Sequence, residues 1–246
     1  MENVLSPLVT GPESPESPAP AGSLLVRTAA WRVGCLPSAS LSPSMTTSAR
    51  QIVTAAALDA FGEDDHVEII DGELVQEAMT SFEHGDAQVS LAGELKAYFR
   101  GSGPPGGDGG WWIASEVDVE YSPTQVFRHD ASGWRKARVP GRPTGKRVTT
   151  RPDWVCEILS TNRSKDTVLK RRVLHEFGVP HYWIVDLDEP LLTVLRYHQD
   201  GYIIVATVAP GERARLEPFG AVELEVARLF GDLDGSSLPE SDKPGR

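Results

Sequence analysis

The sequence predicts a mixed α/β fold, of the α+β kind, with a mixed central β-sheet flanked by helices. Two observations favour it: helix-like segments at residues 84–99 and 165–177 are separated by strand-like runs, and three more strand-like runs follow the second helix. The chain has 246 residues, of which 40% are hydrophobic and 24% charged, as in an ordinary globular protein. We therefore expect one domain with a sizeable core.

The first predicted elements are a short helix, a hairpin and an amphipathic helix. Residues 49–61 favour the short helix, and residues 67–77 contain two apolar runs joined by Asp71-Gly72, a sequence typical of a tight β-turn. The helix at residues 84–99 carries apolar side chains at helical spacing. Its predicted buried face consists of Ala87, Leu91, Leu95 and Tyr98 or Phe99.

A glycine- and proline-rich break then leads into the predicted strands. Trp111-Trp112 are interpreted as the start of a core strand, and stacking on nucleic-acid bases is the alternative. Strict alternation predicts a strand over residues 116–121, and a second strand is expected near 125–130. A basic loop containing proline and glycine is expected over residues 131–149.

The second half of the domain is predicted to be a strand, a helix and three strands. WVCEIL forms the strand over residues 154–159, and the helix at 165–177 ends at Gly178. The three strand-like runs that follow are residues 181–186, 191–197 and 202–208. Tyr182-Trp183, inside the first of these runs, are predicted to be core residues.

The two ends of the chain differ in composition from its middle. Residues 1–44 contain seven of the 19 prolines and eight serines without a hydrophobic period, so they are predicted to be a disordered extension. Met45 opens the first stretch of helical character and is the expected true start of translation. Residues 45–233 are predicted to form the domain, and residues 234–246 a flexible tail.

Cysteine usage and the lengths of the apolar runs indicate a cytoplasmic protein. Cys35 and Cys156 are too few for a disulfide framework, and Cys156 is predicted to be a small core residue. No apolar run approaches the ~18 residues of a membrane-spanning helix. The N-terminal segment does not match the pattern of a signal peptide. No membrane partner is therefore expected.

Positive charge is concentrated in one part of this acidic chain. The formal net charge is −11, yet residues 128–172 hold 13 of the 24 Lys and Arg and only four of the 35 acids, 13 − 4 = +9. Such asymmetry can attract a polyanion while the rest of the chain keeps the protein soluble. A solvated loop with chance clustering is the alternative interpretation.

Glu157 is an acid in the middle of a predicted core strand. Asp153 shares its face but lies ~13 Å away at ~3.3 Å per residue, too far for one ion in a regular strand. Asp130 ends the preceding strand, and a hairpin between the two strands would bring it near Glu157. Two such carboxylates repel unless a cation or a proton intervenes. Alternatively, Glu157 lies on a solvated face and Asp130 caps a turn.

The stretch from residue 152 to 186 resembles the restriction endonuclease family of the Uma-two type, within the PD-(D/E)xK nuclease superfamily. The upstream pieces IIDGELV, Glu83-His84 and HDASGW also resemble the family, so that the resemblance covers residues 49–230. The matching downstream residues are Asp153, Glu157, Ser160, Asp166, Lys170, Gly178-Val179, Tyr182-Trp183 and Asp186.

The resemblance implies a restriction-endonuclease-like core and a metal-dependent cut of DNA. Asp130 and Glu157 would bind Mg²⁺ or Mn²⁺, and Lys170 would be the displaced lysine of the superfamily, because Leu159 occupies its usual place. Without the resemblance, Lys170 would be assigned to an exposed basic face. Glu83 resembles the first-helix acid that completes the site. Asp153 is the fallback ligand and would need a β-bulge to approach Glu157.

The sequence departs from the family pattern at several positions. His129 precedes Asp130 where the family usually has proline, and Thr161 follows Ser160 where proline is common. The leading hypothesis is a DNA endonuclease, and a homodimer is expected by analogy. The alternatives are a DNA-binding or regulatory protein that has lost efficient cleavage, and an interaction module without nucleic acid.

Overall fold

The computed structural model describes residues 52–62, 65–77, 79–99, 109–159 and 163–231. The predicted extension over 1–44, Met45, Cys35 and the tail from residue 234 lie outside the described residues. Within them, no helix is long and apolar enough to cross a membrane.

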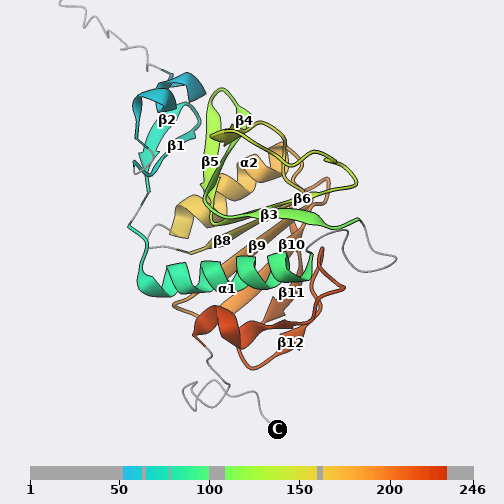
Figure 1. Ribbon diagram of the computed structural model, residues 1–246. Coiled ribbons are helices and arrows are strands. Elements are labelled where there is room, and N and C mark those ends of the chain that lie inside the picture. Colours follow the sequence, from blue (N-terminus) through green and yellow to red (C-terminus); the bar gives the residue numbers. More distant parts are fainter. Residues whose placement is uncertain (1–51, 63–64, 78, 100–108, 160–162, 232–246) are drawn as a thin grey trace, which may run out of the picture. The chain divides into compact units, whose positions relative to one another are not determined.

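The strands form two main sheets, shown in Figure 1, where one mixed sheet was predicted. The first sheet has the order β2-β1-β5-β4-β7. Its strands are β1 (Val67–Ile70), β2 (Glu73–Gln76), β4 (Val117–Ser122), β5 (Gln125–His129) and β7 (Arg147–Val148). Only the β4–β7 pair is parallel in this sheet.

The second sheet has the order β11-β10-β9-β8-β6-β3. Its strands are β3 (Trp111–Ala114), β6 (Ala131–Arg135), β8 (Trp154–Ile158), β9 (His181–Asp186), β10 (Leu191–Arg196) and β11 (Ile203–Val208). The β8–β9 pair is parallel and the others are antiparallel. The predicted mixed α/β class is thus confirmed.

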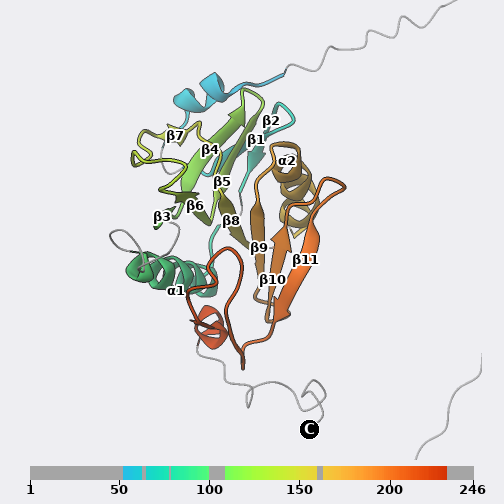
Figure 2. The same cartoon turned by 90° about the vertical axis from the view of Figure 1, so that its right-hand side faces the viewer.

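Helices cover both faces of the second sheet. Figure 1 shows β8, β9 and β10 between α1 and α2, and Figure 2 shows α1 and α2 on opposite sides of β8. The helical elements are η1 (Ala55–Ala60), α1 (Phe82–Tyr98), η2 (Lys165–Lys170), α2 (Arg171–Glu176) and η3 (Val226–Phe230). A small pair, β12 (Arg213–Ala214) and β13 (Leu224–Glu225), completes the described elements.

Strand β8 shows why Glu157 points to the α2 side. Trp154, Cys156 and Ile158 pack in the core beneath α1, while Val155 packs on the opposite side with Leu174 of α2. Since strand side chains alternate, Glu157 shares the α2 side with Val155. Cys156 is buried, as predicted.

The predicted hairpin over residues 67–77 is confirmed. Asp71 and Gly72 both have positive φ, 52° and 75°, as a two-residue type I′ turn requires. A Cβ atom at Gly72 would lie 2.7 Å from Cγ2 of Ile52. The turn places β1 beside β5, and thereby brings Glu68 of β1 to the strand that precedes Asp130.

The predicted loop over residues 131–149 and the predicted hairpin between strands 125–130 and 154–159 are wrong. The loop region contains β6 and β7, and β8 pairs with β6 instead of β5. The chain passes from the first sheet to the second at Asp130. Because Ala131 pairs with Cys156, extending this register by one residue sets Asp130 opposite Glu157.

The predicted helix over residues 165–177 is confirmed, with an irregular first half. Residues Lys165–Lys170 are π-helical and continue into α2, and Gly178 follows with φ of 66°. π-Helical turns occur frequently at functional sites. Here the turn buries Lys165, Asp166 and Lys170.

Candidate active site

Lys170 lies at the centre of a buried cluster of charged side chains, not on an exposed basic face. Its side chain is 1% exposed, whereas its neighbours Arg171 and Arg172 are exposed. The ammonium is 2.9 Å from Oε1 of Glu68 and 3.1 Å from Oε2 of Glu157. It lies 3.2 Å from the carbonyl oxygen of Arg128, to which it donates.

Glu157 is held at both carboxyl oxygens. Oε2 contacts Lys170, and Oε1 lies 2.5 Å from Nδ1 of His129. The other ring nitrogen of His129, Nε2, lies 2.8 Å from the hydroxyl of Tyr121. His129 is fully buried. Its contact with Oε1 therefore holds the Glu157 side chain in place.

Asp130 lies between β5 of the first sheet and β6 of the second, where the chain passes from one sheet to the other. Its Oδ2 accepts a hydrogen bond from the backbone N–H of Ile158 at 2.6 Å. Its Oδ1 lies 2.8 Å from Nε2 of His84 in α1. Gln88, one turn further along α1, donates to the Asp130 carbonyl oxygen at 2.9 Å. Asp130 is therefore tied both to β8 and to the first helix.

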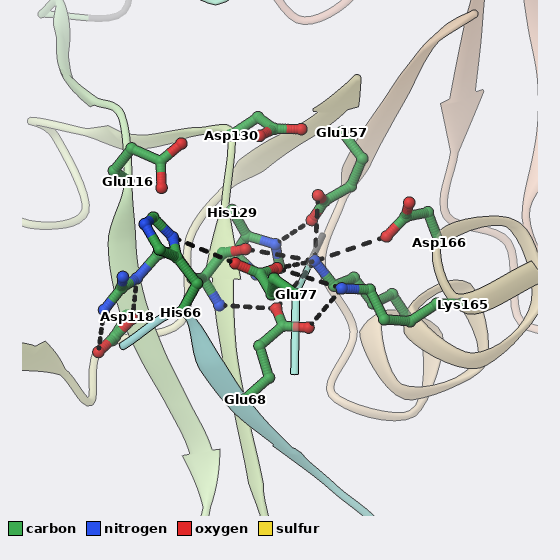
Figure 3. A network of polar contacts seen from close by, with 12 residues as sticks. His66, Glu68, Glu77, Glu116, Asp118, His129, Asp130, Glu157, Lys165 and Asp166 are labelled. Carbon is green, nitrogen blue, oxygen red and sulfur yellow. Dashed lines mark hydrogen bonds and ion pairs between the residues drawn. The ribbon is translucent and has the colours of Figure 1, made fainter. Parts of the chain in front are cut away.

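The β1–β2 hairpin contributes two further acids. Glu68 accepts a hydrogen bond from the backbone N–H of Arg128 at 2.9 Å, and Lys165 lies 3.0 Å from its other oxygen. Glu77 lies 3.1 Å from Lys165 and 3.8 Å from Lys170. Figure 3 shows Glu68 and Glu77 beside Lys165.

Burial and charge set the protonation of the cluster. Burial raises the pKa of Glu157 well above its usual value; Lys170 lowers it by less, and Asp130 adds to the rise. Burial opposes the charge of Lys170, but Glu157 and Glu68 raise its pKa, so it stays protonated. For Glu68, Lys170 and Lys165 outweigh burial and lower the pKa.

The two histidines differ. Burial, reinforced by Lys170 and Lys165, lowers the pKa of His129 well below its usual value, so its ring is neutral at pH 7. Burial has the same effect on His84, but its hydrogen bond with Asp130 and the negative charges of Asp130, Glu116 and Asp166 together outweigh it and raise the pKa. The positive form of His84 is therefore favoured beside Asp130.

Asp130 and Glu157, the two predicted metal ligands, line one small cavity of ≈ 30 Å³ together with Asp166 and Lys170. This volume corresponds to about one water molecule. Among the residues that the structure describes, no set of three or more His, Cys, Asp and Glu side chains is arranged to hold a metal.

The donor chemistry at this cavity nevertheless fits Mg²⁺. Mg²⁺ is commonly held by one or two protein carboxylates, with water and substrate phosphate as the other ligands. Each oxygen of Asp130 and Glu157 has one contact above and retains a second lone pair. Five acids face two lysines: Glu68, Glu77, Asp130, Glu157 and Asp166 against Lys165 and Lys170. A divalent cation would reduce this excess.

The structure does not bring the other two predicted site residues to the cavity. Glu83 is exposed in the first turn of α1, where its own backbone N–H and Ser81 lower its pKa. The neighbouring residue His84 reaches Asp130 instead. Asp153, the fallback ligand, accepts from the Arg135 backbone N–H and pairs with Arg138. The fallback interpretation therefore finds no support in the geometry.

The basic segment 128–172 presents less free charge than its formal +9 suggests. At least six of its cations pair with acids outside the segment, brought near by the fold. These pairs are Arg128–Asp118, Arg147–Asp59, Arg163–Asp186, Lys165–Glu77, Lys170–Glu68 and Arg172–Asp71. Phosphates were expected from the sequence to bind along the whole segment. Because many of its cations are paired, the composition of the segment does not support that expectation.

Comparison with known proteins gives the family. The model of the Uma2 family, described as "Putative restriction endonuclease", matches residues 54–227, well over half of the chain. The chain belongs to the Uma2 family. The predicted resemblance is thereby confirmed, and Uma2 membership supports a nuclease function in general.

A solved structure shares the fold. The crystal structure of "a putative nuclease belonging to DUF820" from Anabaena variabilis is similar to this Uma2 chain with a TM-score of 0.58 and 20% sequence identity. The match covers 73% of this chain and 98% of that chain. Among the curated proteins, no significant match was found.

Proposed function

We propose that the chain is a metal-dependent endonuclease that hydrolyses phosphodiester bonds of DNA. The observation that supports this most is the contact of the buried Lys170 ammonium with Glu157, at 3.1 Å, beside a cavity that Asp130 also lines. Buried groups whose pKa values are strongly shifted by charged partners, such as Glu157 and Lys170, are typical of functional sites. Membership of a family described as restriction endonucleases supports a nucleic acid as the charged substrate.

Asp130 and Glu157 would hold Mg²⁺ or Mn²⁺. When bound, such an ion polarises the scissile phosphate and lowers the pKa of a bound water. His84 and the Ile158 N–H keep the Asp130 carboxylate oriented toward the cavity. His129 does the same for Glu157, so that the protein supplies both carboxylates in a fixed geometry.

Lys170 supplies permanent positive charge. Its neighbours keep it protonated, so it is suited to stabilise the negative charge that develops on the phosphate oxygens. It is not suited to act as a general base, because its proton is held too tightly. Glu68 and the Arg128 carbonyl fix the ammonium from the other side.

The proposal is tested with supercoiled plasmid, Mg²⁺ or Mn²⁺ and matched variants. We expect nicking by the wild type and a loss of at least ~100-fold in Asp130→Asn, Glu157→Gln and Lys170→Met. Asp153→Asn is the control, because Asp153 lies on the same side of the sheet as Glu157 but outside the cavity. Equal nicking by all of these proteins would refute the assignment.

The DNA-binding alternative gives a different result. A protein that has lost cleavage would bind the plasmid but would not nick it in the presence of any divalent metal. The variants would then bind the plasmid like the wild type. Calorimetric titration with Mn²⁺ adds a readout that needs no cleavage. Binding of Mn²⁺ by the wild type and its loss in Asp130→Asn would support the metal site on its own.

A further inference from the structure

A second concave surface lies outside the candidate active site. It is a groove of ≈ 730 Å³ between β3, β6 and the segment that precedes β7. Among the described residues that line it are three cations and three tryptophans, and none of these lining residues is an acid. These residues are Lys96, Lys136, Arg142, Trp111, Trp112 and Trp134. In a chain of net charge −11, a groove whose charged lining residues are all cations favours an anionic ligand.

Trp112 is the aromatic side chain suited to contact a ligand. It is partly exposed, whereas Trp111 and Trp134 are buried in the core. Its ring N–H donates to the Val139 carbonyl at 3.0 Å, and the Lys136 ammonium lies 4.6 Å from the ring centroid. The ring is therefore held in place before any ligand binds, which lowers the entropy lost on binding.

The groove and the candidate active site lie on either side of one turn. Ala114 and Val117 line the groove, and Glu116 between them lines the cavity that contains Asp130 and Glu157. Trp112 is four residues before Glu116, at most ~13 Å along the chain at ~3.3 Å per residue. A stacked strand covers this distance in about four nucleotides at ~3.4 Å each.

We propose that this groove binds a single-stranded segment of nucleic acid, with a base that displaces the Lys136 ammonium from the Trp112 ring and stacks there, and with phosphates beside Lys136 and Arg142. Only an unpaired base can offer its face to an aromatic side chain, so the tryptophan favours a single strand over an intact duplex. The inference rests on the proposed function for its substrate class. It adds where the strand lies next to the site.

Fluorescence anisotropy with a labelled 12-nucleotide DNA strand in EDTA tests the groove without cleavage. We expect Trp112→Ala and Arg142→Glu each to weaken binding by about tenfold or more, and Trp112→Phe to remain near the wild type. Arg215→Glu is the matched control, because Arg215 is an exposed arginine that does not line the groove. Arg142→Ala should reduce the slope of log affinity against log salt by about 0.7.

The outcomes separate the groove from the proposed reaction. Two results would overturn the proposed binding groove even if the plasmid is nicked. One is wild-type affinity for the single strand in Trp112→Ala and Arg142→Glu; the other is an equal loss of affinity in the control Arg215→Glu. A selective loss in the groove variants would support it even if no variant nicks DNA. The same sequence as a duplex should show little effect of Trp112→Ala; an equal effect would contradict stacking. Arg142 is exposed, so Arg142→Glu tests the groove without disturbing the core.

Discussion

His129 and Glu157 are joined inside the protein by a contact of 2.5 Å between Nδ1 and Oε1. His129 in turn lies 2.8 Å from the Tyr121 hydroxyl through Nε2. Because the ring is neutral, it has one N–H and one acceptor nitrogen. When Glu157 is ionised, Nδ1–H donates to it and the tyrosine hydroxyl donates to Nε2. This series of hydrogen bonds from Tyr121 through His129 holds Glu157, one of the two proposed metal ligands, in position.

Tyr121→Phe should loosen this arrangement without touching the cavity. The substitution leaves Nε2 of a fully buried histidine without its partner and removes the support of Glu157. We expect Mn²⁺ affinity or nicking to fall by ~10-fold or more, as for other residues that position metal ligands. Tyr197→Phe, on an exposed tyrosine, is the control. Unchanged Mn²⁺ affinity in a folded Tyr121→Phe protein would argue against the positioning role.

Elements with a clear period or turn signal were predictable from the sequence. The Asp71-Gly72 hairpin, helix α1 and the strands β9 to β11 all follow such signals. Strand β6 was not predicted, because ASGWR has three small residues and no alternation. A Cβ on its Gly133 would be tightly packed, at 3.0 Å from Ile113 and 3.1 Å from both Trp111 and Trp154, so that these side chains would have to shift. Close packing, rather than periodicity, defines this strand.

Two residues of the site, Glu68 and His84, were not predicted, although the sequence contained a pattern that indicated each of them. Glu68 is an acid between apolar residues of a strand, the same feature that drew attention to Glu157. His84 is three residues before Ala87 and seven before Leu91, so it lies on the buried face of α1, whereas Glu83 is rotated by ~100° away from it. The acidic partners of the cations in the basic segment 128–172 could not be predicted, because these acids come from distant parts of the chain.

Glu68→Gln should destabilise the protein strongly. Glu68 is the nearest anion to Lys170, at 2.9 Å, and also contacts Lys165 and the Arg128 N–H. Removal of one partner from a buried ion pair costs ~3–5 kcal/mol in the free energy of unfolding. Urea denaturation measures it. Glu120→Gln, which removes a partly exposed partner of Arg147, should cost less than ~1 kcal/mol; equal costs would contradict the central place of Glu68.

Asp153→Asn should affect stability and leave the metal site intact. The substitution replaces an oxygen that accepts from Arg135 N–H or Arg138 with a second donor. Because the Asp153 side chain is buried, we expect a loss of ~1–3 kcal/mol in the free energy of unfolding. Calorimetric Mn²⁺ affinity should equal that of the wild type. A loss of Mn²⁺ binding at constant stability would instead make Asp153 a ligand.

Glu77 should make stability depend on pH in an unusual direction. Burial, reinforced by Glu68, raises the pKa of Glu77 from 4.5 to about 7 in the folded protein. Between these values the unfolded chain loses this proton while the folded protein keeps it. The folded state then binds more protons, so the contribution of Glu77 to stability falls as the pH rises from about 4.5 to about 7 and stays level above.

The comparison with Glu77→Gln isolates this effect. Glutamine does not titrate, so the difference in unfolding free energy, wild type minus variant, should decrease across this window by up to ~3 kcal/mol. Urea denaturation at half-unit steps from pH 4 to pH 8 measures it, and any constant loss from the Lys165 contact cancels in the slope. Parallel curves for the two proteins would mean that Glu77 ionises normally, and that Lys165 and Lys170 already balance the acids of the cluster without a further cation.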